Sequence, residues 1–125
     1  MKAILCTHFG TPDELELADI PQPSAGPGEV VVRIKAAALN FFDLLIIAGK
    51  YQHKPPFPFS PASEFAGIVE HVGAGVTEIA PGDRVMGSTG WGAAVSTGAS
   101  CLCLHSALGH CQKAPALSHF STMYG

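Results

Sequence analysis

The sequence predicts a small, mainly β fold, a barrel or sandwich of short strands with short helices. Its 125 residues are the length of one domain, and apolar residues make up 47% of it, enough for a core. Several segments alternate apolar and polar residues with period two, which is typical of half-buried strands. Clusters of Gly and Pro separate these segments at short intervals, as in all-β domains.

The first part of the chain contains three of these strand segments. Residues 1–9 are mostly apolar and end at the turn cluster GTPD, 10–13. The alternating run LELADI, 15–20, predicts a half-buried strand. Residues 21–28, PQPSAGPG, are too rich in Pro and Gly for a helix or a central strand. The β-branched run EVVVRIKAAA, 29–38, predicts the next strand.

The following part contains one ambiguous element and two more strands. Residues 40–49, NFFDLLIIAG, are apolar and end in Gly, which fits a short helix or a pair of turns. Four prolines in 54–61 predict an extended loop. The alternating segment 64–72, EFAGIVEHV, predicts a strand, in which Gly67 indicates a bulge or a close backbone approach. Residues 81–86, PGDRVM, predict a turn leading into another strand.

The charge balance excludes several classes of protein. A net charge of -3 leaves no cationic surplus for nucleic acid, and the chain is too apolar for a disordered acidic tail. No apolar run approaches the ~18 residues of a membrane span. Polar residues interrupt the N-terminus too early for a signal peptide. We therefore expect a cytoplasmic protein, with no nucleic-acid or membrane partner and without disulfides.

Two segments carry a resemblance to a known family. GPGEVVVRIKAAALNFFDLLIIAGKYQ, 26–52, and PASEFAGIVEHVGAGVTEIAPGDRVMG, 61–87, resemble the medium-chain dehydrogenase/reductase superfamily. With the N-terminal MKAILC, the match covers residues 1–93 in consecutive order. The resemblance is greatest to the zeta-crystallin-like quinone oxidoreductase branch. It implies a GroES-like β-barrel that forms the N-terminal catalytic domain, followed by a Rossmann domain. It also implies hydride transfer from NADPH to a quinone or an α,β-unsaturated carbonyl in the cleft between them.

The residue types argue against a catalytic zinc ion. Zinc-dependent relatives have Cys where this chain has Asn40, and a Gly-His-Glu triplet where it reads Ala62, Ser63 and Glu64. A catalytic zinc site needs about three His, Cys or carboxylate ligands. Asn40 and Ser63 are poor replacements, so we predict a site without metal.

The resemblance also implies a set of site residues. It implies Asn40, Phe41 and Tyr51 as cofactor contacts, and Asn40, Asp43, Tyr51 and Trp91 as the substrate pocket. Each has a structural alternative. Asn40 could cap a turn, and Asp43 could be an acid in the first turn of a helix. Phe41 could belong to the core, Tyr51 could anchor a loop, and Trp91 could pack against a turn.

No side chain is assigned as a catalytic acid. The cofactor supplies the hydride, and solvent can supply the proton. Glu64 is a candidate, but we expect instead a buried glutamate paired with Arg84 or another cation.

The composition changes after residue 93. All ten acidic and six of the seven basic residues lie before position 92, and Lys113 is the only charged residue after it. We interpret 94–118 as an atypical segment that a local shift of the reading frame would explain. A divergent, loop-rich tail is the alternative, and the nucleotide sequence would decide between them. Residues 119–125 would begin the connection to a missing nucleotide-binding domain.

The same region is rich in Cys and His. A small metal-binding domain is therefore an alternative function, although the C-x-C spacing is tighter than the usual C-x2-C loop. The residues concerned are Cys101, Cys103, His105, His110 and Cys111.

The 125 residues contain no dinucleotide fingerprint. The Gly pair in 73–75 has no third Gly, and Pro27 interrupts the pair in 26–28. We therefore expect no tight NADPH binding and no activity for this chain by itself. The face left without its partner domain should make the chain marginally stable or a homo-oligomer. A non-catalytic, GroES-like interaction module is a further alternative.

Overall fold

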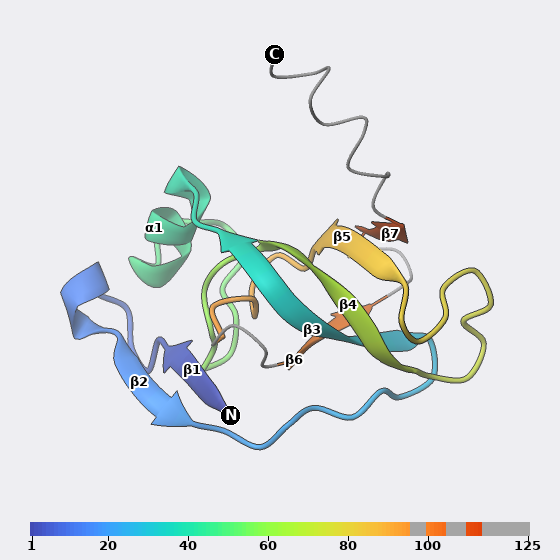
Figure 1. Cartoon of the computed structure of the whole chain (residues 1–125). Coiled ribbons are helices and arrows are strands. Elements are labelled where there is room, and N and C mark those ends of the chain that lie inside the picture. The colour runs from blue at the N-terminus through green and yellow to red at the C-terminus, as the bar shows by residue number, and fades with distance from the viewer. Residues whose placement is uncertain (96–99, 105–109, 114–125) are drawn as a thin grey trace, which may run out of the picture.

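The structure, a computed structural model, describes residues 1–95, 100–104 and 110–113 (Figure 1). Its strands form a two-stranded sheet, β1-β2, and a five-stranded sheet in the order β6-β3-β4-β5-β7. The expected mainly β fold is confirmed. The elements are β1 (Lys2–Leu5), η1 (Pro12–Glu14), β2 (Glu16–Asp19), β3 (Glu29–Ala38), α1 (Phe41–Ile47), β4 (Glu64–Val72), β5 (Arg84–Ser88), β6 (Ser100–Leu104) and β7 (His110–Lys113).

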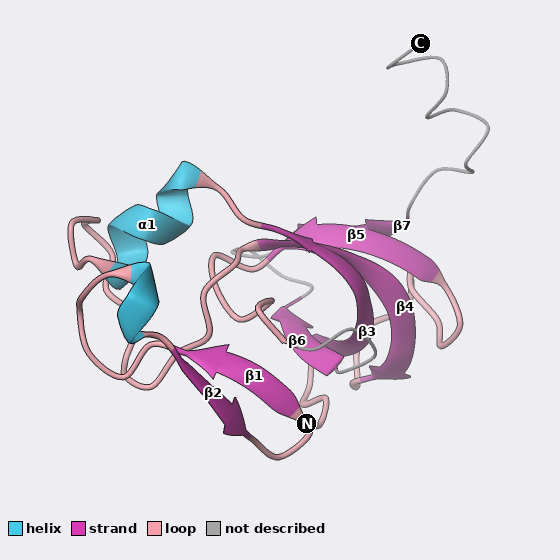
Figure 2. Ribbon diagram, turned by 60° about the vertical axis from the view of Figure 1, so that its left-hand side comes forward, coloured by secondary structure: helices cyan, strands magenta, loops and turns pink. Residues whose placement is uncertain are grey.

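The long strands β3 and β4 form the centre of the larger sheet. They are antiparallel and pair from Val30↔Val72 to Ala38↔Glu64, over the bounds that the sequence predicted. Strand β5 pairs with β4, and β7 with β5, while β6 lies on the other side of β3. Figure 2 shows how strongly this sheet curves. Residues of β3, β4 and β5 contribute to the main core, whose buried members are Val30, Val32, Ile34, Ala62, Phe65, Val69, Ile79, Val85 and Ala93.

Gly67 is needed where β3 and β4 come closest. The register between the two strands shifts between Ile34 and Ala36, opposite Gly67. A Cβ atom on Gly67 would collide with the carbonyl oxygen of Arg33 and with the side chain of Val32. The sequence-based expectation of a bulge and a close backbone approach is confirmed.

A smaller unit packs beside the main sheet. Strands β1 and β2 pair over four residues each, and α1 covers a second cluster of buried residues. The segment 40–49 is therefore a helix of seven residues rather than a pair of turns. The second cluster consists of Cys6, Ile46, Ile47 and Phe59, with Leu15, Phe42, Tyr51 and Trp91 packed against it.

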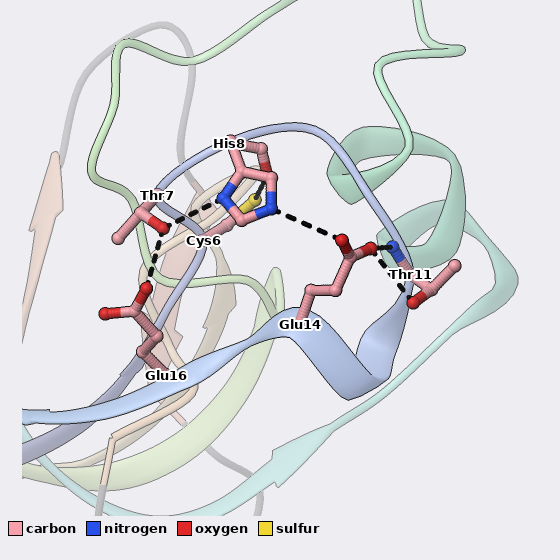
Figure 3. A network of polar contacts seen from close by, with 6 residues as sticks. All are labelled: Cys6, Thr7, His8, Thr11, Glu14 and Glu16. Atoms are coloured by element: carbon pink, nitrogen blue, oxygen red, sulfur yellow. Dashed lines mark hydrogen bonds and ion pairs between the residues drawn. The ribbon is translucent and has the colours of Figure 1, made fainter.

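A polar network fixes the loop between β1 and β2 (Figure 3). Glu14 Oε2 accepts hydrogen bonds from the backbone N–H of Thr11 at 2.7 Å and from its hydroxyl at 3.1 Å. The ring of His8 lies 3.4 Å from the other oxygen of Glu14. The hydroxyl of Thr7 donates to Glu16 at 3.0 Å. These bonds position η1 and Leu15 beside α1.

The larger sheet includes two strands from the chain beyond residue 93. Strands β6 and β7 lie in the segment 94–118, and they continue the sheet at β3 and β5. The proposed division of the chain at residue 93 stays a prediction. Residues 119–125 lie outside the described part. None of the described helices is long and apolar enough to cross a membrane.

Candidate functional site

The candidate site lies where β3 ends and α1 begins. Ala38, the last residue of β3, pairs with Glu64, the first residue of β4. The chain then turns through Leu39 and Asn40 into α1, with Asn40 extended at φ -125° and ψ 165°. The N-terminus of the helix and the start of β4 are therefore neighbours.

Asp43 joins these two segments. One carboxylate oxygen accepts the backbone N–H of Asn40 at 2.7 Å, and the other accepts the N–H of Ala62 at 3.0 Å. Asp43 is 5% exposed, and its own N–H donates to the carbonyl of Asn40 at 3.0 Å. Its position in the first turn also suits the positive end of the helix dipole. Asp43 is thus an acid in the first turn of a helix, as its structural alternative predicted. Its role as a substrate contact stays a prediction.

Ala62 has an unusual backbone conformation that this contact helps to hold. Its φ of 63° lies in the left-handed region, and its side chain is fully buried. The backbone N–H of Ala93 donates to the carbonyl of Ala62 at 2.9 Å. The backbone N–H of Thr89 donates to the carbonyl of Ser63 at 2.8 Å. Hydrogen bonds on both sides therefore fix the segment that leads into Glu64.

The predicted environment of Glu64 is wrong. Glu64 is exposed rather than buried, and it lies opposite Ser88, whereas Arg84 lies opposite Ile68. Four residues of strand separate the two positions by about 13 Å, too far for an ion pair. Glu64 instead accepts a hydrogen bond from Asn40 Nδ2 at 3.1 Å. The pairing depends on strand register, which the sequence pattern did not supply.

An open apolar groove lies beside Asn40. Its volume is ≈ 290 Å³, and its lining comes from η1, α1 and the loop before β4. A second hollow of similar volume adjoins it and shares Leu39, whose side chain is 76% exposed. The first groove is lined by Pro12, Leu15, Leu39, Asn40, Asp43, Leu44, Ile47 and Pro61.

The structure divides the predicted site residues between two faces of α1. Asn40 and Asp43 line the groove, and Phe41 is 73% exposed. Tyr51 packs edge-on against Phe42, with ring centroids 4.7 Å apart, and does not line this groove. Trp91 does not line this groove either, and its ring stacks on that of His53 with ring centroids 5.2 Å apart. Tyr51 and Trp91 both contact the second core cluster.

The sequence reasoning missed every apolar residue of the groove, including Pro12, Leu15 and Pro61. Leu39, Leu44 and Ile47 are the other three lining residues that were not predicted. Helical spacing could have indicated two of them, because Leu44 and Ile47 follow Asn40 at intervals of four and three.

The described residues offer no metal centre. Among them, no group of three or more His, Cys, Asp or Glu could hold a metal ion. Burial raises the pKa of the Cys6 thiol, whose Sγ donates to the carbonyl of His8 at 3.0 Å. The backbones of Cys101, Cys103, His110 and Cys111 lie in β6 and β7, but their side chains, like all of His105, fall outside the described part.

Of the three predicted cofactor contacts, only Asn40 lines the groove. Asn40 presents an amide at the edge of an apolar groove, and an amide can pair with a carboxamide. The phosphates of a dinucleotide usually need a Gly-rich loop at a helix N-terminus. Such a loop is absent from residues 1–95, and the residue before α1 is Asn40.

Comparisons with known proteins agree with this reading of the fold. Residues 26–123 match the model of the alcohol dehydrogenase GroES-like domain. The chain is 42% identical over 88 residues to the synaptic vesicle membrane protein VAT-1 homolog of Rattus norvegicus, covering 69% of this chain and 22% of that protein.

Solved structures show the same likeness. A quinone oxidoreductase of Pseudomonas syringae is 34% identical with a TM-score of 0.82, over 93% of this chain and 34% of that one. The Escherichia coli quinone oxidoreductase complexed with NADPH is 29% identical with a TM-score of 0.69, over 92% of this chain and 33% of that one. The chain thus spans between 22% and 34% of the length of these proteins.

Proposed function

Because the chain belongs to the alcohol dehydrogenase GroES-like domain family of the medium-chain dehydrogenase/reductase superfamily, we propose that it forms one wall of a hydride-transfer site. The reaction is reduction of a quinone or α,β-unsaturated carbonyl by NADPH. The observation that carries the proposal is the Asn40 amide at the edge of an open apolar groove, in a chain that resembles quinone oxidoreductases.

The groove suits a flat, uncharged acceptor. Leu39, Leu44 and Ile47 provide apolar contact, and both oxygens of Asp43 already accept backbone N–H groups. When bound, the cofactor supplies the hydride, so the protein must supply position and exclude water. Residues of the second wall would complete the site.

We further propose that this site works without metal, because Asn40 and Ser63 stand at the positions of zinc ligands. Metal analysis of the purified chain tests this. We expect zinc well below one equivalent. One zinc ion per chain that is still bound after Cys101→Ser and Cys103→Ser are introduced together would refute the proposal.

A chimera tests the catalytic role. Residues 1–93 would replace the matching barrel residues of the E. coli quinone oxidoreductase, and NADPH oxidation by 1,4-benzoquinone would be followed by absorbance. We expect turnover by the chimera and none above background by this chain alone. In the chimera, Asn40→Ala should lower kcat/KM on the order of tenfold, the effect of losing one hydrogen bond to the reacting pair. A folded chimera that binds NADPH without turnover would refute the proposal.

A further inference from the structure

The Asn40 side chain has a defined orientation. Its Nδ2 donates to Glu64 Oε2 at 3.1 Å. A carboxylate can only accept hydrogen bonds, so the nitrogen of the Asn40 amide must face Glu64. The Oδ1 atom therefore points away from the carboxylate, and in the capping box at the start of α1 it faces the backbone N–H of Asp43. An amide oxygen has two lone pairs, so one remains for a ligand.

The backbone holds both partners of this bond in place. Asn40 is fixed by Asp43, which accepts its N–H at 2.7 Å and donates to its carbonyl at 3.0 Å. Glu64 begins β4 opposite Ala38, and Thr89 N–H holds the carbonyl of the preceding Ser63 at 2.8 Å. The Asn40–Glu64 contact thus follows from the fold, although both side chains are exposed.

The charge at this place favours one kind of ligand over another. Hydride transfer leaves positive charge on the nicotinamide ring and negative charge on the oxygen of the acceptor. The Glu64 carboxylate lies within hydrogen-bonding distance of Asn40 and would oppose a developing oxyanion there. The same carboxylate would favour a ring that becomes cationic.

We propose that Glu64 is a positioning residue, which turns the Asn40 amide so that Oδ1 accepts a hydrogen bond from the nicotinamide carboxamide. This inference rests on the proposed function, and it assigns Asn40 to the cofactor rather than to the carbonyl of the substrate. Glu64 itself needs no contact with the reacting atoms.

The first test concerns the orientation alone and needs no cofactor. The side-chain amide signals of Asn40 are followed by proton–nitrogen NMR in the 125-residue chain and in Glu64→Ala and Glu64→Gln. The bond to Glu64 should slow solvent exchange of the Nδ2 protons. We expect Glu64→Ala to speed it about threefold or more, as for loss of a single exposed hydrogen bond. Glu64→Gln, which keeps an acceptor oxygen, should restore part of the protection.

The matched control is Glu70→Gln. Glu70 lies on the same strand and accepts from Arg33 Nε at 2.7 Å, so this variant also removes one negative charge from β4. It should leave the Asn40 signals unchanged. The orientation is refuted when Glu64→Ala leaves the exchange of Asn40 as it is in the unaltered chain, or when Glu70→Gln changes it equally.

The second test concerns the ligand. 1-Methylnicotinamide and 1-methylpyridinium are both planar cations, but only the former carries a carboxamide. We expect 1-methylnicotinamide to shift the Asn40 signals at about threefold lower concentration than 1-methylpyridinium, because it can form one additional hydrogen bond. Glu64→Ala should remove that difference. Equal effects of the two cations would overturn the assignment of Asn40 to the carboxamide.

The two proposals fail in different ways. Turnover by the chimera together with unaltered Asn40 signals in Glu64→Ala would refute the positioning role and leave the proposed function standing. Loss of turnover in a folded, NADPH-binding chimera would refute the proposed function, whatever the NMR signals show.

Discussion

Asp43 and Asn40 are close in sequence but differ in what their side chains contact. The carboxylate of Asp43 is buried and bonded to backbone N–H groups on both sides of the site. The amide of Asn40 is exposed and has one side-chain partner, Glu64. Buried polar groups are costly when a partner is lost, whereas exposed groups can turn to water. We therefore expect substitutions at Asp43 to change stability and those at Asn40 to change ligand binding.

Asp43→Asn tests this division. The variant keeps the size of the side chain but turns an amide NH2 toward one backbone N–H, which leaves two donors facing each other. We expect the free energy of unfolding to fall by about 1–3 kcal/mol, measured by urea denaturation. Asp13→Asn, in the exposed helix η1, is the control and should change it by less than about 0.5 kcal/mol. Equal effects of the two variants would contradict the role given to Asp43.

We expect Glu14 to make the stability of the fold depend on pH in the acid range. Hydrogen bonds from the backbone N–H of Thr11, from its hydroxyl and from His8 lower the pKa of Glu14. A carboxyl whose pKa is lower in the folded than in the unfolded chain stabilises the fold above the unfolded value, about 4.3. That contribution disappears as the pH falls through the folded value.

The urea midpoint should therefore decline on acidification below about pH 4.3, and Glu14→Gln should show a smaller decline. Asp13→Asn also removes one negative charge, from an exposed position of η1, and serves as control. The control should lose as much stability on acidification as the unaltered chain. An equal loss in Glu14→Gln would contradict the role given to Glu14.

Strands β3 and β4 depend on the close approach at Gly67. In Gly67→Ala, the new methyl group collides with the Arg33 carbonyl and the Val32 side chain. Because backbone must move, we expect a loss of about 2 kcal/mol or more in the free energy of unfolding. Gly75→Ala meets no atom within 4 Å but has φ +83°, so it reports backbone strain alone, about 1–2 kcal/mol. A milder effect at Gly67 than at Gly75, measured by urea denaturation, would contradict the steric argument.

The elements differ in how far the sequence could predict them. Strands β3 and β4 have local signals, alternation and β-branched residues, and their predicted bounds agree with the structure. The seven residues of α1 are too few for periodicity to separate a helix from turns. The partner of Glu64 was mispredicted because it depends on register between strands. The groove escaped prediction because η1, α1 and the loop before β4 meet only in the folded chain.

At the scale of the whole molecule, the unusual feature is its exposed apolar face. Leu17, Leu39 and Phe41 are each more than 70% exposed, and Ile4 and Leu44 more than 40%. Leu39 joins the two hollows, so much of this surface is continuous. Surfaces of this kind usually mark a contact with another protein or domain. In the proposed enzyme, this face is the wall turned toward the cofactor and its domain.

The last prediction follows from leaving this face uncovered in the 125-residue chain. We expect the chain to associate through it, so that the mass measured by light scattering rises with concentration. Leu39→Lys adds a charge where the two hollows meet, and it should shift the mass toward that of the monomer. Thr77→Lys, on the exposed loop between β4 and β5, adds the same charge elsewhere and should leave association unchanged. A stable monomer at every concentration, or equal effects of the two variants, would show that another surface, or none, drives association.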